Sequence, residues 1–135
     1  MTEQEIIEGN KLIAEFFGAK RSASSNYSHV NIFYYDYPNG TRVGELSLSY
    51  RQLWDWLMPV VEKIETIHDD HHGYFGVHIH ANCCDIQGTN LHLAINDLDG
   101  YGSVYMSDPT AVFPTKIEST WYACVQFIKW YNSKP

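Results

Sequence analysis

Residues 75–96, FGVHIHANCCDIQGTNLHLAIN, contain three short segments in which apolar and polar residues alternate. The segments FGVHIH, CCDIQ and LHLAIN are joined by short turns at the dipeptides AN and GT, and two residues are enough for a hairpin turn. A period of two is typical of strands that bury one face. Because the strands follow one another directly, the stretch predicts a three-stranded antiparallel meander.

The turn lengths also predict a register for this meander. If both turns contain two residues, His78 lies opposite Asp85, and Asp85 lies opposite His92. This register matches the apolar residues across the sheet, on the face toward the core. It leaves a row of polar side chains on the other face, with His80 and Cys83 next to the row.

Outside the meander, residues 3–17, residues 50–67 and the segment after Thr115 carry apolar residues at helical spacing. Each segment starts with a capping box, a hydroxyl residue followed three positions later by Glu or Gln. The boxes are Thr2 with Glu5, Ser49 with Gln52, and Thr115 with Glu118.

The remaining segments predict further strands and loops. AKRSASSN (19–26) is small and polar, which predicts a loop, while YSHVNIFYYDY (27–37) and GTRVGELSLS (40–49) predict two strands around the turn PNG. HDDHH (68–72) is expected to be a solvated helix end, and residues 103–107 are an additional strand candidate.

The predicted order of elements is αββαβββα. Short links between successive strands favour an α+β fold, with an antiparallel sheet of about five strands and the helices packed on one face. A length of 135 residues fits a single domain, 1–135.

Composition narrows the choice of compartment and partners. The net charge of -7, from nine Lys and Arg against sixteen Asp and Glu, argues against duplex nucleic acid or an anionic membrane as partner. No apolar run is long enough to span a bilayer, and the acidic N-terminus is unlike a signal peptide. The three cysteines, two of them adjacent, do not predict a disulfide framework, so we expect a cytoplasmic protein.

The polar row on the meander offers metal ligands, but it also has an ordinary explanation. A sheet covered on one face needs polar residues on the other, and histidine beside aspartate is a favourable cross-strand pair. We therefore expect no bound metal, no cofactor and no catalytic residue. The weak candidates for a metal site are His78, His80, Asp85 and His92.

A second cluster predicts a ligand site. The KRSASSN segment contains cationic and hydroxyl side chains, and a tyrosine-rich strand follows it. Phosphate oxygens bind to cations and hydroxyls, and nucleobases stack on tyrosine rings. The predicted ligand-binding residues are Lys20, Arg21, Ser24, Ser25, Tyr27, Tyr35, Arg42 and Arg51.

WDWLMPVVEKIE (54–65) and KIESTWYACVQFIKWYN (116–132) carry a resemblance to known proteins. Together they resemble a family of small uncharacterised proteins from phages and related Bacteroidetes-type genomes, which share these two helices. The resemblance implies a shared fold and a cytoplasmic accessory protein that binds and blocks a host component. It implies no catalytic residue.

The leading functional hypothesis is a non-catalytic binding protein, either a monomer or a homo-oligomer. It would sequester a small anionic, nucleotide-like ligand or block a host protein. The first alternative is a protein interaction module without a small-molecule site, built on exposed aromatic residues. A metal-dependent hydrolase that uses the histidine row is the weakest alternative.

Overall fold

The structure, a computed structural model, describes residues 1–25, 31–70, 72–81, 83–88, 103–106 and 115–133; for residues 24, 25, 31, 32 and 103–106 it describes the backbone alone. Within these ranges the fold is α+β, as predicted. The helices are α1 (Glu3–Phe16), α2 (Trp54–Thr66) and α4 (Lys116–Ser133), with a short 3-10 helix η1 (Glu45–Ser47). The strands are β1 (Lys20–Ser25), β2 (Asn31–Asp36), β3 (Arg42–Gly44), β4 (His68–Asp69), β5 (Gly73–Ile79), β6 (Cys84–Gly88) and β7 (Ser103–Met106).

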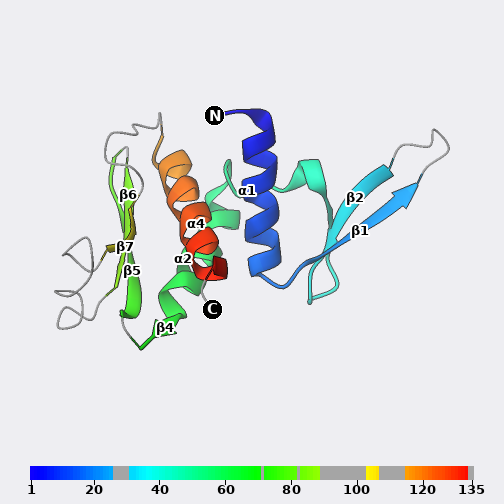
Figure 1. The fold of residues 1–135 in the computed structure, drawn as a ribbon. Coiled ribbons are helices and arrows are strands. Elements are labelled where there is room, and N and C mark those ends of the chain that lie inside the picture. The colour runs from blue at the N-terminus through cyan, green and yellow to red at the C-terminus, as the bar shows by residue number, and fades with distance from the viewer. Residues whose placement is uncertain (26–30, 71, 82, 89–102, 107–114, 134–135) are drawn as a thin grey trace.

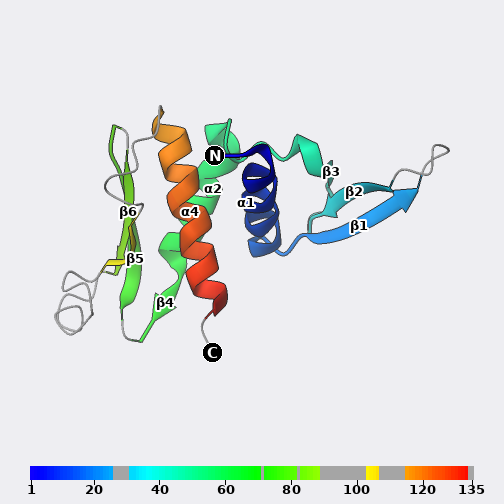
Figure 2. The same cartoon turned by 45° about the horizontal axis from the view of Figure 1, so that its top comes forward.

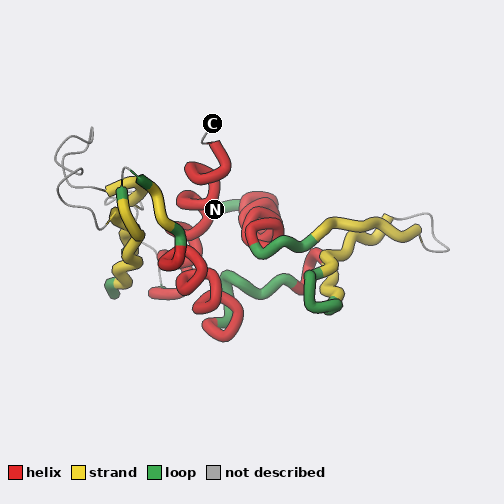
Figure 3. Tube along the Cα trace, turned by 90° about the horizontal axis from the view of Figure 1, so that it is seen from below, coloured by secondary structure: helices red, strands yellow, loops and turns green. Residues whose placement is uncertain are grey.

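The strands form two antiparallel sheets, not the single sheet of about five strands that the sequence predicts. One sheet has the order β1-β2-β3 and the other β4-β5-β6-β7. The helices lie between them: α2 and α4 cover one face of the β4–β7 sheet, and α1 lies on the side of the β1–β3 sheet (Figure 1, Figure 3). The β1–β2 hairpin extends away from the helices (Figure 2). No strand pairing joins the two sheets among the described residues, and β3, which has only three residues, continues into η1.

The β5–β6 hairpin has the predicted register. His78 lies opposite Asp85, and Val77 lies opposite Ile86. The turn is closed by the backbone N–H of residue 80, which donates to the carbonyl of residue 83 at 2.9 Å. Because the alternation is regular, the apolar side chains of both strands face α2 and α4.

The third strand of this sheet is not the predicted one. β6 pairs on its other edge with β7, so that Asp85 lies opposite Met106 and Ile86 opposite Tyr105. The prediction that Asp85 lies opposite His92 is therefore wrong, and LHLAIN (91–96) lies outside the described residues. Alternation determines which face a strand presents, but it does not determine which neighbour the strand pairs with.

Residues 20–25 form strand β1, although their composition predicts a loop. They pair with β2 over their full length, with Arg21 opposite Tyr35 and Ser24 opposite Ile32. Small polar residues have little strand preference of their own, but an aromatic neighbouring strand supplies both hydrogen-bond partners and cross-strand contacts. Tertiary pairing therefore overrides the local preference in this segment.

Two of the three predicted capping boxes cap helices. The Thr2 and Thr115 hydroxyls accept hydrogen bonds from the backbone N–H groups three residues later. The predicted capping box at Ser49 is wrong. The Ser49 hydroxyl donates to the Ser47 carbonyl, and helix α2 begins at Trp54.

The segment after α2 is also more ordered than predicted. His68 and Asp69 form β4, which pairs with the first residues of β5. The imidazole Nδ1 of His72 lies 3.2 Å from the Asp69 carboxylate, and its ring packs edge-on against Trp130 with centroids 5.7 Å apart. These residues close one end of the core.

The core lies between the β4–β7 sheet and the helices. Apolar residues from the two segments of helical spacing that form α2 and α4 are buried at its centre, namely Leu57, Val60, Ile64, Trp121, Val125 and Ile128. Cys84 is buried in this core, whereas the adjacent Cys83 is partly exposed. One polar side chain spans the core: Asn10 accepts a hydrogen bond from the Trp121 indole at 2.9 Å and donates to the Leu48 carbonyl at 3.2 Å. Because both ends of the amide are bonded, its burial is compensated.

Candidate functional site

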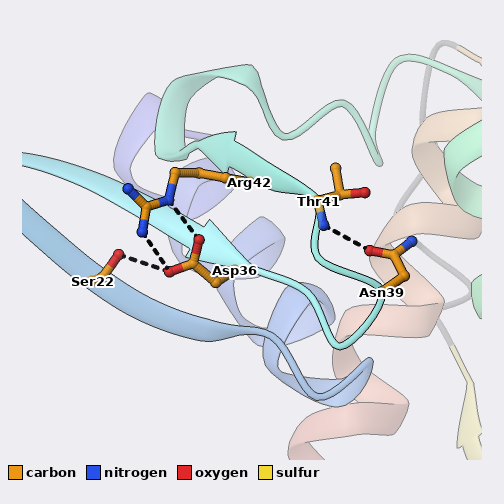
Figure 4. A network of polar contacts seen from close by, with 5 residues as sticks. All are labelled: Ser22, Asp36, Asn39, Thr41 and Arg42. Atoms are coloured by element: carbon orange, nitrogen blue, oxygen red, sulfur yellow. Dashed lines mark hydrogen bonds and ion pairs between the residues drawn. The ribbon is translucent and has the colours of Figure 1, made fainter.

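The predicted basic site is divided into separate ion pairs. Arg42 of β3 donates two hydrogen bonds to the Asp36 carboxylate, at 2.6 and 3.1 Å, and the Ser22 hydroxyl donates a third at 3.1 Å (Figure 4). The hydrogen bonds from Arg42 lower the pKa of the Asp36 carboxyl. Asp36 thus already occupies the guanidinium fork that would bind a phosphate.

Arg21 is paired in a similar way. Its Nη2 lies 3.4 Å from the Glu45 carboxylate, and its guanidinium carbon lies 3.6 Å from the centre of the Phe33 ring. The Tyr35 hydroxyl donates to the same Glu45 oxygen at 3.5 Å, and the Tyr35 side chain has no exposed surface. Burial raises the pKa of Tyr35 above its ordinary value. The Tyr35 ring, which we predicted to stack on a base, therefore has no face open to a ligand.

The other predicted residues do not join this group. Lys20 is exposed at the start of β1. Arg51 lies 3.3 Å from Glu118 of α4, in a different part of the fold. The side chains of Ser24 and Ser25 and all of Tyr27 lie outside the description. The structure therefore brings no anion site together from the described residues, and binding of a nucleotide at this place stays a prediction.

A pocket of about 350 Å³ lies between the β2–β3 turn, the end of α1 and the first half of α2. We call it the aromatic pocket, because four of its lining residues are Phe17, Tyr37, Tyr50 and Trp56. Its size is within the range of sites for small organic ligands, which is about 300 to 1,000 Å³.

The tight β2–β3 turn places one wall of the pocket. Gly40 adopts a positive φ of 91°, and the backbone N–H of Tyr37 donates to the Thr41 carbonyl at 2.9 Å. The Asn39 side chain holds the turn from within, since its Oδ1 accepts a hydrogen bond from the Thr41 N–H at 2.9 Å (Figure 4). Asn39 and Thr41 thus present polar edges beside the Tyr37 ring.

The rings in the pocket are held at fixed angles. Phe17 and Tyr50 are parallel, with an interplanar angle of 5° and centroids 6.3 Å apart. Trp56 is nearly perpendicular to Tyr50, at 86° and 5.2 Å. The Tyr37 and Tyr50 hydroxyls are hydrogen-bonded at 2.6 Å. This packing arranges ring faces and edges around one cavity before any ligand is bound.

The charge around the aromatic pocket is negative. Asp55, in the first turn of α2, is exposed at the pocket, and it has no ion-pair partner among the residues that the structure describes. No Lys or Arg is among the lining residues. Because like charges repel, the pocket disfavours an anion and favours a neutral or positively charged ligand.

Burial raises the pKa of the Tyr37 and Tyr50 phenols above the ordinary value of 10.0. An unfolded chain releases these protons from about pH 10, whereas the folded chain retains them. Their contribution to stability is therefore complete below pH 10 and declines as the pH rises above it. We expect urea midpoints to fall between about pH 9 and pH 11.

The variant Tyr50→Phe tests whether Tyr50 is a source of the loss of stability at alkaline pH. It removes one raised phenol, so its urea midpoint should fall less steeply with pH than that of the parent. The buried thiols of Cys84 and Cys124, whose pKa values are also raised, act in the same direction and are present in both proteins. Equal slopes in the two proteins would contradict the assignment to Tyr50.

Three of the four weak metal candidates lie at the β5–β6 hairpin, namely His78, His80 and Asp85. His78 lies opposite Asp85. His80 is at the end of this hairpin, and its Nε2 lies 3.6 Å from Asp85 Oδ1. His92 lies outside the described residues. Of the four candidates, His80 and Asp85 are thus close enough to form an ion pair.

Sequence reasoning missed the aromatic pocket. It placed Phe17, Tyr50 and Trp56 within the helical segments 3–17 and 50–67, and it named none of them as a binding residue. The available signal lay in two short segments, the PNG turn and the WDW segment. Both have aromatic residues in or beside them, and WDW also contains a carboxylate. No regular spacing connects residues so far apart along the chain.

Comparisons with protein-family models, with curated proteins and with solved structures find no match. The resemblance to the phage family therefore stays a prediction. Among the described residues, none of the helices has the length and apolar character needed to cross a membrane.

Proposed function

We propose that this chain is a non-catalytic binding protein, and that the aromatic pocket binds an organic ammonium group, meaning a positively charged nitrogen that carries alkyl substituents. The observation that carries this proposal is the combination, in one cavity, of four aromatic rings with a carboxylate that forms no ion pair with any described residue. The chemistry is shared by a free alkylammonium compound and by a methylated lysine of a host protein.

The physical basis is the charge distribution of the rings. An aromatic ring is negative on its face, so a cation over the face is attracted by about 0.5 to 2 kcal/mol, and tryptophan is the strongest partner. Alkyl groups on the nitrogen reduce its hydration and match the apolar walls. Asp55 adds a direct Coulomb attraction, and the net charge of -7 attracts cations over longer distances.

The lining also supports binding over catalysis. It contains no Cys, His, Lys or Ser, and its two phenols have pKa values raised by burial. Asp55 is the one Asp, Glu, Lys, Arg or His side chain in the lining. An acid–base pair or an activated nucleophile would need a second titrating group.

The anionic-ligand hypothesis is less well supported. To bind a phosphate, Arg42 would have to leave Asp36 and Arg21 would have to leave Glu45. The freed carboxylates would then repel the incoming anion. The ammonium ligand needs no such rearrangement.

Calorimetry with choline, a trimethyl-lysine peptide and a set of nucleotides tests the proposal. We expect choline or the peptide to bind and the nucleotides not to bind. Trp56→Ala and Asp55→Asn should each weaken the ammonium ligand by about fivefold or more, the equivalent of ~1 kcal/mol. The matched control is Trp54→Ala, which removes an exposed indole that does not line the pocket.

Two other outcomes would overturn this assignment. If neither ammonium ligand binds, the aromatic pocket is not the site. If nucleotides bind and Arg21→Glu abolishes that binding, the site is the basic strand pair β1–β2. Because Arg21 lies on β1 and pairs with Glu45, circular dichroism must confirm that this variant is folded.

A further inference from the structure

Three metal-ligating side chains of different chemistry meet at the end of the β5–β6 hairpin. His80 and Cys83 flank the turn, where the backbone N–H of the first donates to the carbonyl of the second at 2.9 Å. Asp85 follows Cys83 by two positions, so both point to the same face of the strand. This face is turned away from the helices, because the intervening Cys84 is buried in the core.

The ligand atoms of this group are close together. An imidazole nitrogen of His80, the Cys83 sulfur and a carboxylate oxygen of Asp85 all lie within 4.8 Å of one another. The ligand atoms of a tetrahedral zinc ion are about 3.3 to 3.8 Å apart. The 3.6 Å between His80 Nε2 and Asp85 Oδ1 is already within this range. Small side-chain rotations suffice to bring the sulfur to the same distance.

His78 is on the same face but outside the group. Its Nε2 lies 3.3 Å from the position that a Cβ on Gly76 would occupy, so the imidazole lies back over the glycine. The row predicted from the sequence, His78 with Asp85 and His92, contained no thiol. The set that the structure assembles contains one.

We propose that His80, Cys83 and Asp85 form a binding site for a zinc-like divalent cation, which goes beyond the ligand site in the aromatic pocket. Nitrogen, sulfur and carboxylate oxygen are the donors that zinc takes in proteins, and three protein ligands leave a fourth position for water. On binding, the Cys83 thiol loses its proton to solvent and the imidazole stays neutral.

Cys83 differs from the other two cysteines in the properties that this role needs. It is partly exposed, whereas Cys84 and Cys124 are buried. A metal arriving from solvent can therefore reach Cys83 alone among the three.

Cobalt(II) spectroscopy tests this site, since a cobalt–thiolate bond gives an intense charge-transfer absorption band. Reduced, chelator-treated full-length protein should show this band on addition of one equivalent of cobalt, and zinc should displace the cobalt and remove the band. Cys83→Ser should abolish the band, and His80→Ala should weaken zinc binding by about tenfold or more.

His78→Ala is the matched control, because it removes an imidazole from the same strand and face. Zinc affinity in this variant should stay within about twofold of the parent, which is the scatter of such titrations. The absence of the band in the parent, its persistence in Cys83→Ser, or equal losses in His78→Ala and His80→Ala would each overturn the proposal.

Discussion

The variant Val125→Asp is expected not to fold. Val125 lies in α4 with 4% of its surface exposed, beside the core residues Cys124 and Ile128. The core cluster that contains it is made of apolar side chains, among them Trp121, Cys124 and Ile128. A buried, unpaired carboxylate costs several kcal/mol, against a total stability of about 5 to 15 kcal/mol for a domain.

Circular dichroism and urea unfolding measure this effect. The matched control is Lys129→Asp, one helical turn further along α4 and exposed, which should retain a cooperative transition within about 1 kcal/mol of the parent. A cooperative transition of near-parental stability in Val125→Asp would mean that α4 presents a different face to the core.

The second large effect is expected from Gly9→Ala. Alanine is the better helix former by about 1 kcal/mol, so the change would stabilise an ordinary helix. In α1, however, a Cβ at this position would lie 2.4 Å from Trp121 Cζ2 and 3.1 Å from Val125 Cγ2. Trp121 cannot move freely, because its indole donates to Asn10. We therefore expect a net destabilisation of about 1 to 3 kcal/mol.

Urea unfolding of Gly9→Ala beside Glu8→Ala separates the two contributions. Glu8 is the preceding residue and is exposed, so its replacement adds no contacts to α4; it removes only a surface hydrogen bond from Gln4 and a surface ion pair with Lys11. A Gly9→Ala protein that is more stable than the parent would show that α1 does not approach α4 this closely.

Local signals predicted the local parts of this fold. The alternation in FGVHIH and CCDIQ predicted the register of β5 and β6, and two hydroxyl caps predicted where α1 and α4 begin. The helical stripes predicted the buried face of α2 and α4. Each of these features depends on residues that are close along the chain, where periodicity and capping act directly.

Partner choice between distant segments could not be predicted in the same way. The polar segment 20–25 is a strand because of its pairing with β2, and β6 pairs with β7 although another alternating segment follows it directly. Both outcomes depend on tertiary contacts. The division of the strands into two sheets likewise depends on which distant segments pair with each other.

The candidate sites differ in how far the sequence could predict them. The sequence indicated the neighbourhood of the hairpin cluster, because His80 and Cys83 border one turn. It did not indicate the aromatic pocket, whose rings come from the end of α1, the β2–β3 turn and α2. Nor did it show that Arg21 and Arg42 are paired with carboxylates. The two candidate sites use different residues, so their tests are independent.

The central claim, that the aromatic pocket recognises a positive charge, is tested most directly by one comparison of affinities. Choline and its neutral carbon analogue, in which a tert-butyl group replaces the trimethylammonium group, have nearly the same shape. If cation–π attraction and Asp55 act as proposed, choline should bind about fivefold to thirtyfold more tightly, the equivalent of ~1 to 2 kcal/mol. Equal affinities for the two compounds, or no binding of either, would contradict the claim.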